Sequence, residues 1–287
     1  MTRDDPIAEA YVAACLDELD APKPGNVHRL APGHGMSVAD FVLSARASAG
    51  SIAHRGARVG VRVRNAVDAT LTAVGQNTKL GIILLCAPLA AAAESGETEL
   101  RPALAAVLDS LDRRDAADVF AAIVRANPGG LGRAARHDVG APATGTLREA
   151  MAEAADRDRI ARQYVTAYED IFSLGLPALE AALRKGRGPR WSTLSVYLAF
   201  LASLPDSHIL RKFDAATAVE TQRDASRWRE ALESAHDLEP MIAGLLRWDA
   251  ALKSRAINPG TSADLTVATL FAATLGAVRS MQLDLTR

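Results

Sequence analysis

A polar loop that leads directly into an apolar run is the feature that most constrains this sequence. Gly75–Gly81 carries an amide, a hydroxyl and a lysine, and the following residues from Ile82 to Ala87 are all apolar. Such a run predicts a buried helix whose N-terminus faces the loop. Helix N-termini present unpaired N–H groups and a partial positive charge, so this one could bind an anion. The alternative is a tight turn before a core helix, with Lys79 in solvent.

The rest of the chain has the same helical character. Apolar residues recur at helical spacing between polar breaks, as at Ile7, Tyr11, Cys15 and Leu19, and alternating strand-like segments are absent from the sequence. We therefore predict an all-α fold. Because neither a fixed-period repeat nor a low-complexity tract occurs, we expect residues 1–287 to form a single helical domain.

Two local signals predict where helices begin. Ser37 and Asp40 have the spacing of a capping box, with aspartate in the position that glutamate usually occupies. Asp156 is expected to cap a helix that runs through Tyr164 and Tyr168.

Composition argues against several classes of partner. The net charge is −1, from 33 basic and 34 acidic residues interspersed along the chain, which gives no electrostatic footprint for nucleic acid or an anionic membrane. Cys15 and Cys86 form neither a disulfide framework nor a metal cage. The charged N-terminus resembles no secretory signal, and the longest apolar run, Gly81–Ala93, is too short to span a bilayer. We expect a cytoplasmic protein.

Four polar loops share one composition and are candidates for a site. Only five of the 33 basic residues are lysines, and all but Lys185 lie in or beside the loops between the apolar stretches. The four loops are Pro22–Asn26, Gly75–Lys79, Asp206–His208 and Asn258–Asp264. If they converge, their backbone N–H groups, lysines and carboxylates would form a pocket suited to a polyphosphate and its Mg²⁺.

Several familiar catalytic motifs are absent from the sequence. It contains neither a GxxxxGK[ST] loop nor a Rossmann fingerprint after a strand. Its six histidines include no HExxH or HxH pair, and it has no GxSxG elbow. A phosphate site in this chain must therefore be of another kind.

The four loops resemble the ordered motifs of the triphosphoribosyl-dephospho-CoA synthase family, whose members accompany citrate lyase and malonate decarboxylase. The matching segments are Pro22-Lys-Pro-Gly25, the Asn77-Thr78 loop, Asp206 before His208-Ile-Leu, and Asn258-Pro-Gly-Thr-Ser-Ala-Asp-Leu265, within a resemblance from about Leu16 to Phe271. It implies an all-helical enzyme that moves the triphosphoribosyl unit of ATP onto a ribose hydroxyl of dephospho-CoA and releases adenine. The product is the prosthetic-group precursor for an acyl carrier protein.

The resemblance also implies catalytic roles. The transition state would resemble an oxocarbenium ion, so a carboxylate, Asp264 or Asp206, would deprotonate the acceptor hydroxyl or stabilise the cation. His28 or His208 could protonate the departing adenine. Alternatively, Asp264 could be the acidic member of a capping box with Thr261, and His208 could cap a helix or sit satisfied in the core.

The same loops supply the expected nucleotide site. Lys23 and Lys79 would grip the triphosphate with Mg²⁺, and the two prolines that flank Lys23 would fix its position. The expected nucleotide-binding residues are Lys23, Gly25, Asn26, Asn77, Thr78, Lys79, Asn258, Gly260 and Ser262. The expected Mg²⁺ ligands are Asp206 and Asp264.

Three of the four motifs depart from the family pattern at polar positions. Asn77-Thr-Lys-Leu-Gly81 stands where the family usually has Asn-Thr-His-Lys-Gly, Asn26 and His28 stand where it has leucine and aspartate, and Asp206–Phe213 lacks a histidine and a glycine. The acceptor therefore stays open between dephospho-CoA and a related molecule, such as one in the biosynthesis of a tetrahydromethanopterin-type one-carbon carrier. A non-catalytic nucleotide-binding protein is a further alternative, and a homodimer is an assembly to be tested.

Overall fold

The computed structural model describes residues 5–95, 97–129, 132, 134 and 136–284, with side chains as far as residue 277. Within these ranges the chain forms helices and no strand, so the predicted all-α fold is confirmed. The helices are α1 (Pro6–Asp20), α2 (Val38–Ile52), α3 (Val59–Val74), α4 (Leu80–Ala93), α5 (Leu100–Ser110), α6 (Arg113–Ala126), α7 (Leu147–Ala154), α8 (Arg159–Thr166), a π-helical turn η1 (Ile171–Gly175), α9 (Leu176–Arg184), α10 (Pro189–Ser203), α11 (Ser207–Lys212), α12 (Ala215–Ser234), α13 (Met241–Ser254) and α14 (Gly260–Asp284).

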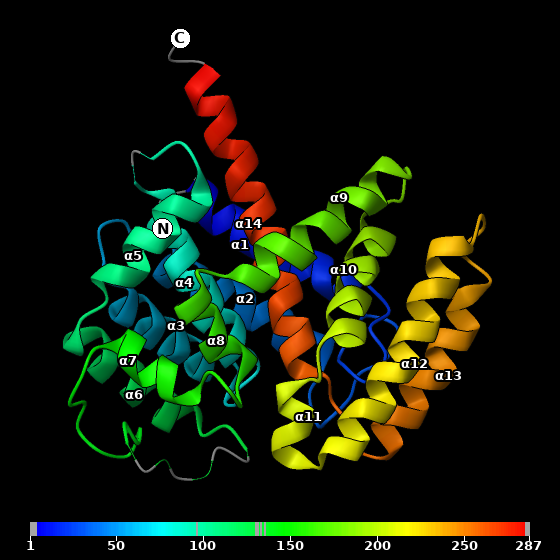
Figure 1. The fold of residues 1–287 in the computed structure, drawn as a ribbon, viewed down its shortest axis with the longest axis horizontal. Helices are drawn as coiled ribbons and strands as arrows, with labels where there is room; N and C mark the ends of the chain where they lie inside the picture. Colours follow the sequence, from blue (N-terminus) through cyan, green and yellow to red (C-terminus); the bar gives the residue numbers. More distant parts are fainter. Residues whose placement is uncertain (1–4, 96, 130–131, 133, 135, 285–287) are drawn as a thin grey trace.

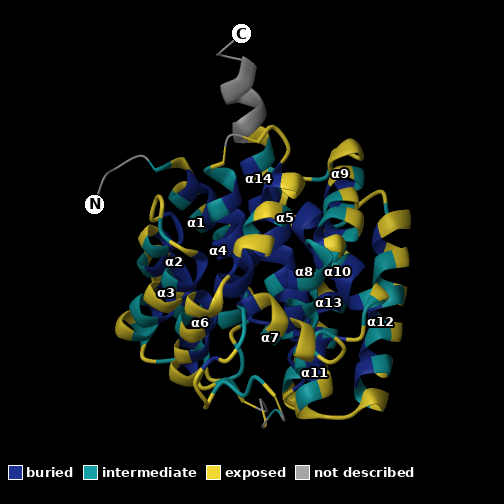
Figure 2. Ribbon diagram, turned by 60° about the vertical axis from the view of Figure 1, so that its left-hand side comes forward, coloured by how far each residue is buried: buried dark blue, intermediate teal, exposed yellow. Residues whose placement is uncertain are grey.

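The long helix α14 lies between two groups of helices. Figure 1 shows α3–α8 on one side of it and α9–α13 on the other. Helix α14 packs against α1, α4 and α10, so it contacts both groups. Buried residues concentrate along these inner helices, while α12 presents exposed residues outward (Figure 2). In the first turns of these two helices, Asp264 of α14 packs against Gly81 of α4.

Helix α4 is the buried helix expected after the Gly75–Gly81 loop. Its residues from Ile82 to Ala90 are all buried, as an all-round apolar helix requires. Pro88 lies inside it and cannot donate to the carbonyl of Leu84, four residues earlier. The hydroxyl of Tyr164 donates to that carbonyl at 2.6 Å, so the proline leaves no buried acceptor unpaired there.

The helix predicted to run through Tyr164 and Tyr168 is shorter than expected. Asp158, and not Asp156, caps α8, because its carboxylate accepts the N–H groups of Ile160 and Ala161. Helix α8 ends at Thr166, and Ala167 and Tyr168 then adopt positive φ angles of 48° and 58°. This turn brings the Tyr168 hydroxyl to the Leu85 carbonyl at 2.9 Å.

The other predicted helix start is confirmed. Ser37 and Asp40 form a reciprocal capping box at the start of α2. In the part of the chain that the structure describes, no helix combines the length and the hydropathy needed to cross a bilayer.

Candidate functional site

A cavity of about 1130 Å³ opens where the N-termini of α4, α11 and α14 meet the loop after α1. All four predicted loops contribute to its lining, so the expected convergence is observed. Eight of the predicted site residues line the cavity: Asn26, Asn77, Thr78, Lys79, His208, Asn258, Gly260 and Asp264. The other five predicted residues, Lys23, Gly25, His28, Asp206 and Ser262, lie outside the lining.

Lys79 is buried at the N-terminus of α4. Only 2% of the residue is exposed, and its Nζ donates to the carbonyl of Phe41 at 3.3 Å, so the alternative of a solvated lysine is wrong. The Asn77 side chain accepts the N–H of Leu80 at 3.1 Å and so satisfies one of the donors at the helix N-terminus. The loop therefore holds a lysine and a helix N-terminus together at one wall of the cavity.

Lys23 is fully buried behind the cavity wall. Its Nζ lies 2.6 Å from Oε1 of Glu18 and donates to Oδ1 of Asn26 at 3.0 Å and to the carbonyl of Val27 at 2.7 Å. Glu18 and Asn26 line the cavity, while Lys23 does not. Sequence reasoning missed Glu18, although a charged residue one turn after Cys15 on the buried face of a helix is a signal that could have identified it.

Direct contacts join the loop after α1 to the loop before α14. The Asn26 side chain donates to Oδ1 of Asn258 at 2.8 Å. Gly25 adopts φ 83°, donates its N–H to Asp249 at 2.8 Å, and approaches Pro259 so closely that an added Cβ would lie 2.7 Å from the Pro259 Cδ atom. Glycine is therefore required at this position both for its backbone conformation and for its small size.

The carboxylate of Asp206 is saturated by protein donors. One oxygen accepts the N–H groups of His208 and Ile209 and caps α11, and the other accepts the N–H and the hydroxyl of Ser262 at 2.8 Å each. A carboxylate has about four acceptor positions, so Asp206 has none left for a metal or a substrate. Asp206 and Ser262 thus connect α11 to α14 behind the cavity.

His208 faces the cavity as a neutral imidazole. Burial, and then the positive charges of Lys212 and Arg211, lower its pKa to about 3. Its ring packs against Gly260, where an added Cβ would overlap Nδ1. The helix cap at this position is Asp206, so the alternative that His208 itself caps α11 is wrong.

Asp264 lies in the first turn of α14, beside the N-terminus of α4, and lines the cavity. Its carboxylate packs against Gly81, and a Cβ at that position would overlap it. Burial, and then the negative charge of Glu18, raise the pKa of Asp264 well above its usual range. Helix α14 begins at Gly260, so Thr261 lies inside the helix, and the alternative of a capping box between Thr261 and Asp264 is wrong.

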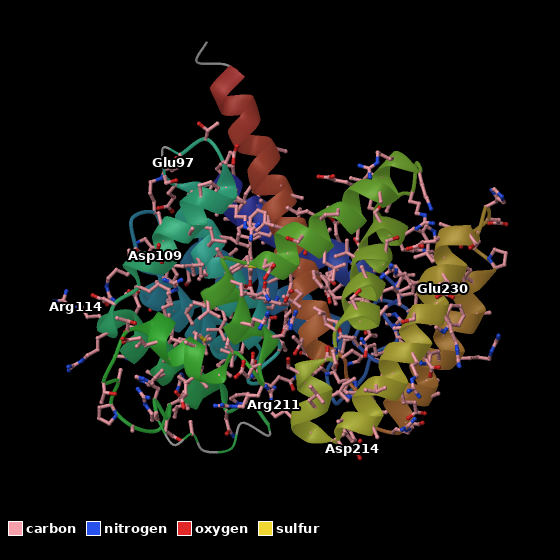
Figure 3. All side chains as sticks on the ribbon, viewed as in Figure 1. Glu97, Asp109, Arg114, Arg211, Asp214 and Glu230 are labelled. Carbon is pink, nitrogen blue, oxygen red and sulfur yellow. The ribbon has the colours of Figure 1, made fainter. Side chains whose placement is uncertain are left out.

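Basic side chains that sequence reasoning did not select also line the cavity. Figure 3 places Arg211 between α11 and the loop that follows α6. Its guanidinium donates to the Gly129 carbonyl at 3.2 Å and to Asp158 at 3.3 Å. Lys212, Arg157 and Arg136 line the same region. Lysines are scarce in this sequence and stand out in its loops, whereas arginines are abundant throughout and give no comparable signal.

An all-helical chain with lysine, arginine and carboxylate groups around one large cavity has the character of an enzyme for phosphorylated substrates. The model of the CitG family, described as ATP:dephospho-CoA triphosphoribosyl transferase, matches residues 4–282. The chain therefore belongs to this transferase family.

The fold is also similar to a crystal structure from Archaeoglobus fulgidus that is provisionally named a triphosphoribosyl-dephospho-CoA synthase. The two share a TM-score of 0.59 and 21% sequence identity over 82% of this chain and 97% of that one. At this identity the similarity concerns the fold alone. Among curated proteins, no sequence matches the chain.

Proposed function

We propose that this chain carries out the family reaction, triphosphoribosyl transfer from ATP to dephospho-CoA, in the cavity between α4, α11 and α14. The proposal rests on one observation: the same cavity is lined by Lys79, Asp264 and several arginines. A volume of about 1130 Å³ lies just above the range of about 300–1,000 Å³ that is usual for single-ligand sites, which suits two nucleotide substrates held side by side.

The triphosphate is assigned to the basic side of the cavity. Lys79 and the N-terminus of α4 supply one group of donors, and Arg211, Lys212 and Arg157 supply another. Guanidinium groups bind phosphate oxygens with paired, charge-assisted hydrogen bonds. Lys23, expected from the sequence to bind the triphosphate directly, is left out of this group because its ammonium is already bonded to protein acceptors.

Asp264 is assigned as the general base. As the bond between the ribose C1′ and N9 of adenine breaks, positive charge develops on the ribose, and the acceptor hydroxyl bonds to C1′. Asp264 takes the hydroxyl proton and returns it to water, and departing adenine takes one proton from water at nitrogen, so protons balance over the cycle. A raised pKa makes the ionised carboxylate a stronger base. His208 is not assigned as the proton donor, because its imidazole is neutral.

Mg²⁺ is assigned to the nucleotide. Among the residues that the structure describes, no group of three or more histidine, cysteine, aspartate or glutamate side chains could hold a metal ion. The expected pair of ligands does not fit, since the carboxylate of Asp206 is saturated. Mg²⁺ commonly arrives bound to phosphate oxygens and keeps several waters, so no protein cage is needed.

The test is mass spectrometry of the purified protein with ATP, Mg²⁺ and dephospho-CoA. Free adenine and a CoA derivative heavier by the triphosphoribosyl unit are expected from the wild-type protein. Asp264→Asn should lower the rate by roughly 100-fold or more, as loss of a general base does. Glu230→Gln, on the exposed face of α12 (Figure 3), is the matched control and should keep the wild-type rate.

Two outcomes would contradict the proposal. Adenine release only with another acceptor, for example a pterin-type one-carbon carrier precursor, would move the chain to a different substrate. Binding of ATP without adenine release under any acceptor would indicate a non-catalytic nucleotide-binding protein.

A further inference from the structure

Glu18 is a buried carboxylate that reaches the cavity from α1. Only 3% of the residue is exposed, yet it belongs to the cavity lining. Its Oε1 atom is bonded to Lys23 at 2.6 Å. A buried carboxylate is costly unless it is paired, and such groups concentrate at functional sites.

Lys23 has no donor left for a substrate. An ammonium group has three N–H donors, and Lys23 places its nitrogen at bonding distance from three acceptors, in Glu18, Asn26 and Val27. It is fully buried and lies between Pro22 and Pro24, which fix the backbone on both sides. Lys23 therefore acts on the cavity only through the groups that it holds.

Two of the carboxylates that line the cavity, Glu18 and Asp264, have different surroundings. Glu18 is tied to an ammonium group, whereas Asp264 packs against Gly81. Burial raises the pKa of Glu18, and the charge of Lys23 and then that of Lys79 oppose this rise. For Asp264, burial and the charge of Glu18 act in the same direction and raise its pKa well above the usual range. Carboxylates with such different surroundings are suited to different roles in one reaction.

We propose that Glu18 is a catalytic residue that stabilises the positive charge developing on the ribose, and that Lys23 is its positioning residue. This inference rests on the proposed function. Glu18 stays ionised and forms no covalent bond, while Asp264 accepts the proton of the acceptor hydroxyl. These separate roles explain why the buried Lys23 lies behind the cavity wall and does not line the cavity.

The test separates this role for Lys23 from direct binding of ATP. Glu18→Gln keeps an acceptor for Lys23 and removes only the charge, so kcat should fall by roughly 100-fold while KM for ATP changes little. Lys23→Met leaves Glu18 unpaired, so the acid limb of the kcat profile should move to higher pH by about 1 to 3 units. The other titratable groups that interact with Glu18 are Lys79, Asp264, Cys15 and Tyr197, and both variants retain them.

The pH profile of kcat in the double variant Glu18→Gln with Lys23→Met distinguishes the proposed role of Lys23 from a purely structural one. It should have the low kcat of Glu18→Gln and lack the displaced acid limb, because the titrating group is gone. The matched control is Glu94→Gln, which removes the charge from another ion pair with a buried partner, Arg62, away from the cavity. This control should keep the wild-type kcat and pH profile even if its melting temperature falls.

Calorimetric titration of the protein with ATP and Mg²⁺ is a second, independent test of the inference. Lys23→Met should bind ATP within about threefold of the wild-type affinity, which is less than the loss of one charged hydrogen bond. A tenfold or greater loss of affinity, or an unchanged kcat in Glu18→Gln, would overturn the inference and leave the proposed function in place. Absence of adenine release by the wild-type protein would overturn the proposed function, and with it the catalytic role of Glu18.

Discussion

The charged residues around the cavity differ in how much of their hydrogen-bonding capacity is already used by other protein groups. Asp206 and Lys23 are buried and have their bonding capacity filled by the protein. Arg211 and Lys79 make fewer such bonds to the residues that the structure describes, and both line the cavity. A charged side chain with unused donors in a cavity can bind a substrate at lower cost than one that must first break protein contacts.

Replacement of Arg211 tests the assignment of the triphosphate. Arg211→Ala should raise KM for ATP by about tenfold, because a hydrogen bond to a charged group contributes about 1.5 to 3 kcal/mol. Steady-state kinetics with each substrate varied in turn would measure the effect. Arg184→Ala, which removes an exposed surface arginine paired with Glu180, is the control and should leave both KM values unchanged. A rise confined to dephospho-CoA would instead place the acceptor at Arg211.

His208 should make stability depend on pH in a defined window. Its folded-state pKa of about 3 lies below the unfolded value near 6.5, so between these values the unfolded chain binds more protons. The free energy of unfolding should therefore fall as the pH drops from about 6.5 toward 3. Urea unfolding at several pH values should show a shallower fall for His208→Gln. His236→Gln, at an exposed histidine, should keep the wild-type slope.

Among the helices, α4 depends on a contact from another element. Pro88 frees the Leu84 carbonyl, and Tyr164 on α8 supplies the missing donor. The turn at Ala167 and Tyr168 places a second hydroxyl on the next carbonyl. Left-handed conformations are unfavourable for residues other than glycine, so these two contacts help to retain the turn.

Tyr164→Phe should therefore destabilise the protein by about 1 to 3 kcal/mol, the cost of leaving a buried carbonyl unpaired. The free energy of unfolding in urea measures it. Tyr11→Phe is a matched control, because Ser48, the partner of the Tyr11 hydroxyl, still donates to the Ser44 carbonyl. Equal losses in the two variants would contradict the proposed role of Tyr164.

The helices were largely predictable from sequence, and the arrangement of the site was predictable in part. Apolar spacing and the Ser37 capping box depend on nearby residues, and both agree with the structure. Asp156 and Asp158 are equivalent in sequence, and only the path of the chain determines which of them caps α8. In the same way, Lys23 and Lys79 lie in similar loops, but Glu18 is positioned to pair with Lys23 behind the cavity wall.

At the scale of the whole molecule, the site is assembled from both ends of the chain. Asn26 bonds to Asn258 and Gly25 bonds to Asp249, across separations of 232 and 224 residues. Helix α14 then links the group α3–α8 to the group α9–α13 (Figure 1). No single helix pair contains the cavity.

Removal of Mg²⁺ should affect turnover and not the fold. We propose that the metal binds the nucleotide, and the described residues contain no group of three or more histidine, cysteine, aspartate or glutamate side chains that could hold a metal ion. EDTA should therefore abolish adenine release, while the melting temperature of the protein without ATP stays unchanged. A melting temperature that falls with EDTA and recovers with Mg²⁺ would indicate a structural metal and contradict the assignment.

The long-range pairing of Asn26 with Asn258 also has a consequence for protein synthesis. The ribosome makes the chain from the N-terminus, and Asp264 is translated long after the loop that contains Lys23. A nascent chain therefore has Glu18 and Lys79 without the opposite wall of the cavity. The cavity is complete only when α14 emerges, so under the proposed function a truncated product that lacks this helix should neither bind ATP nor release adenine.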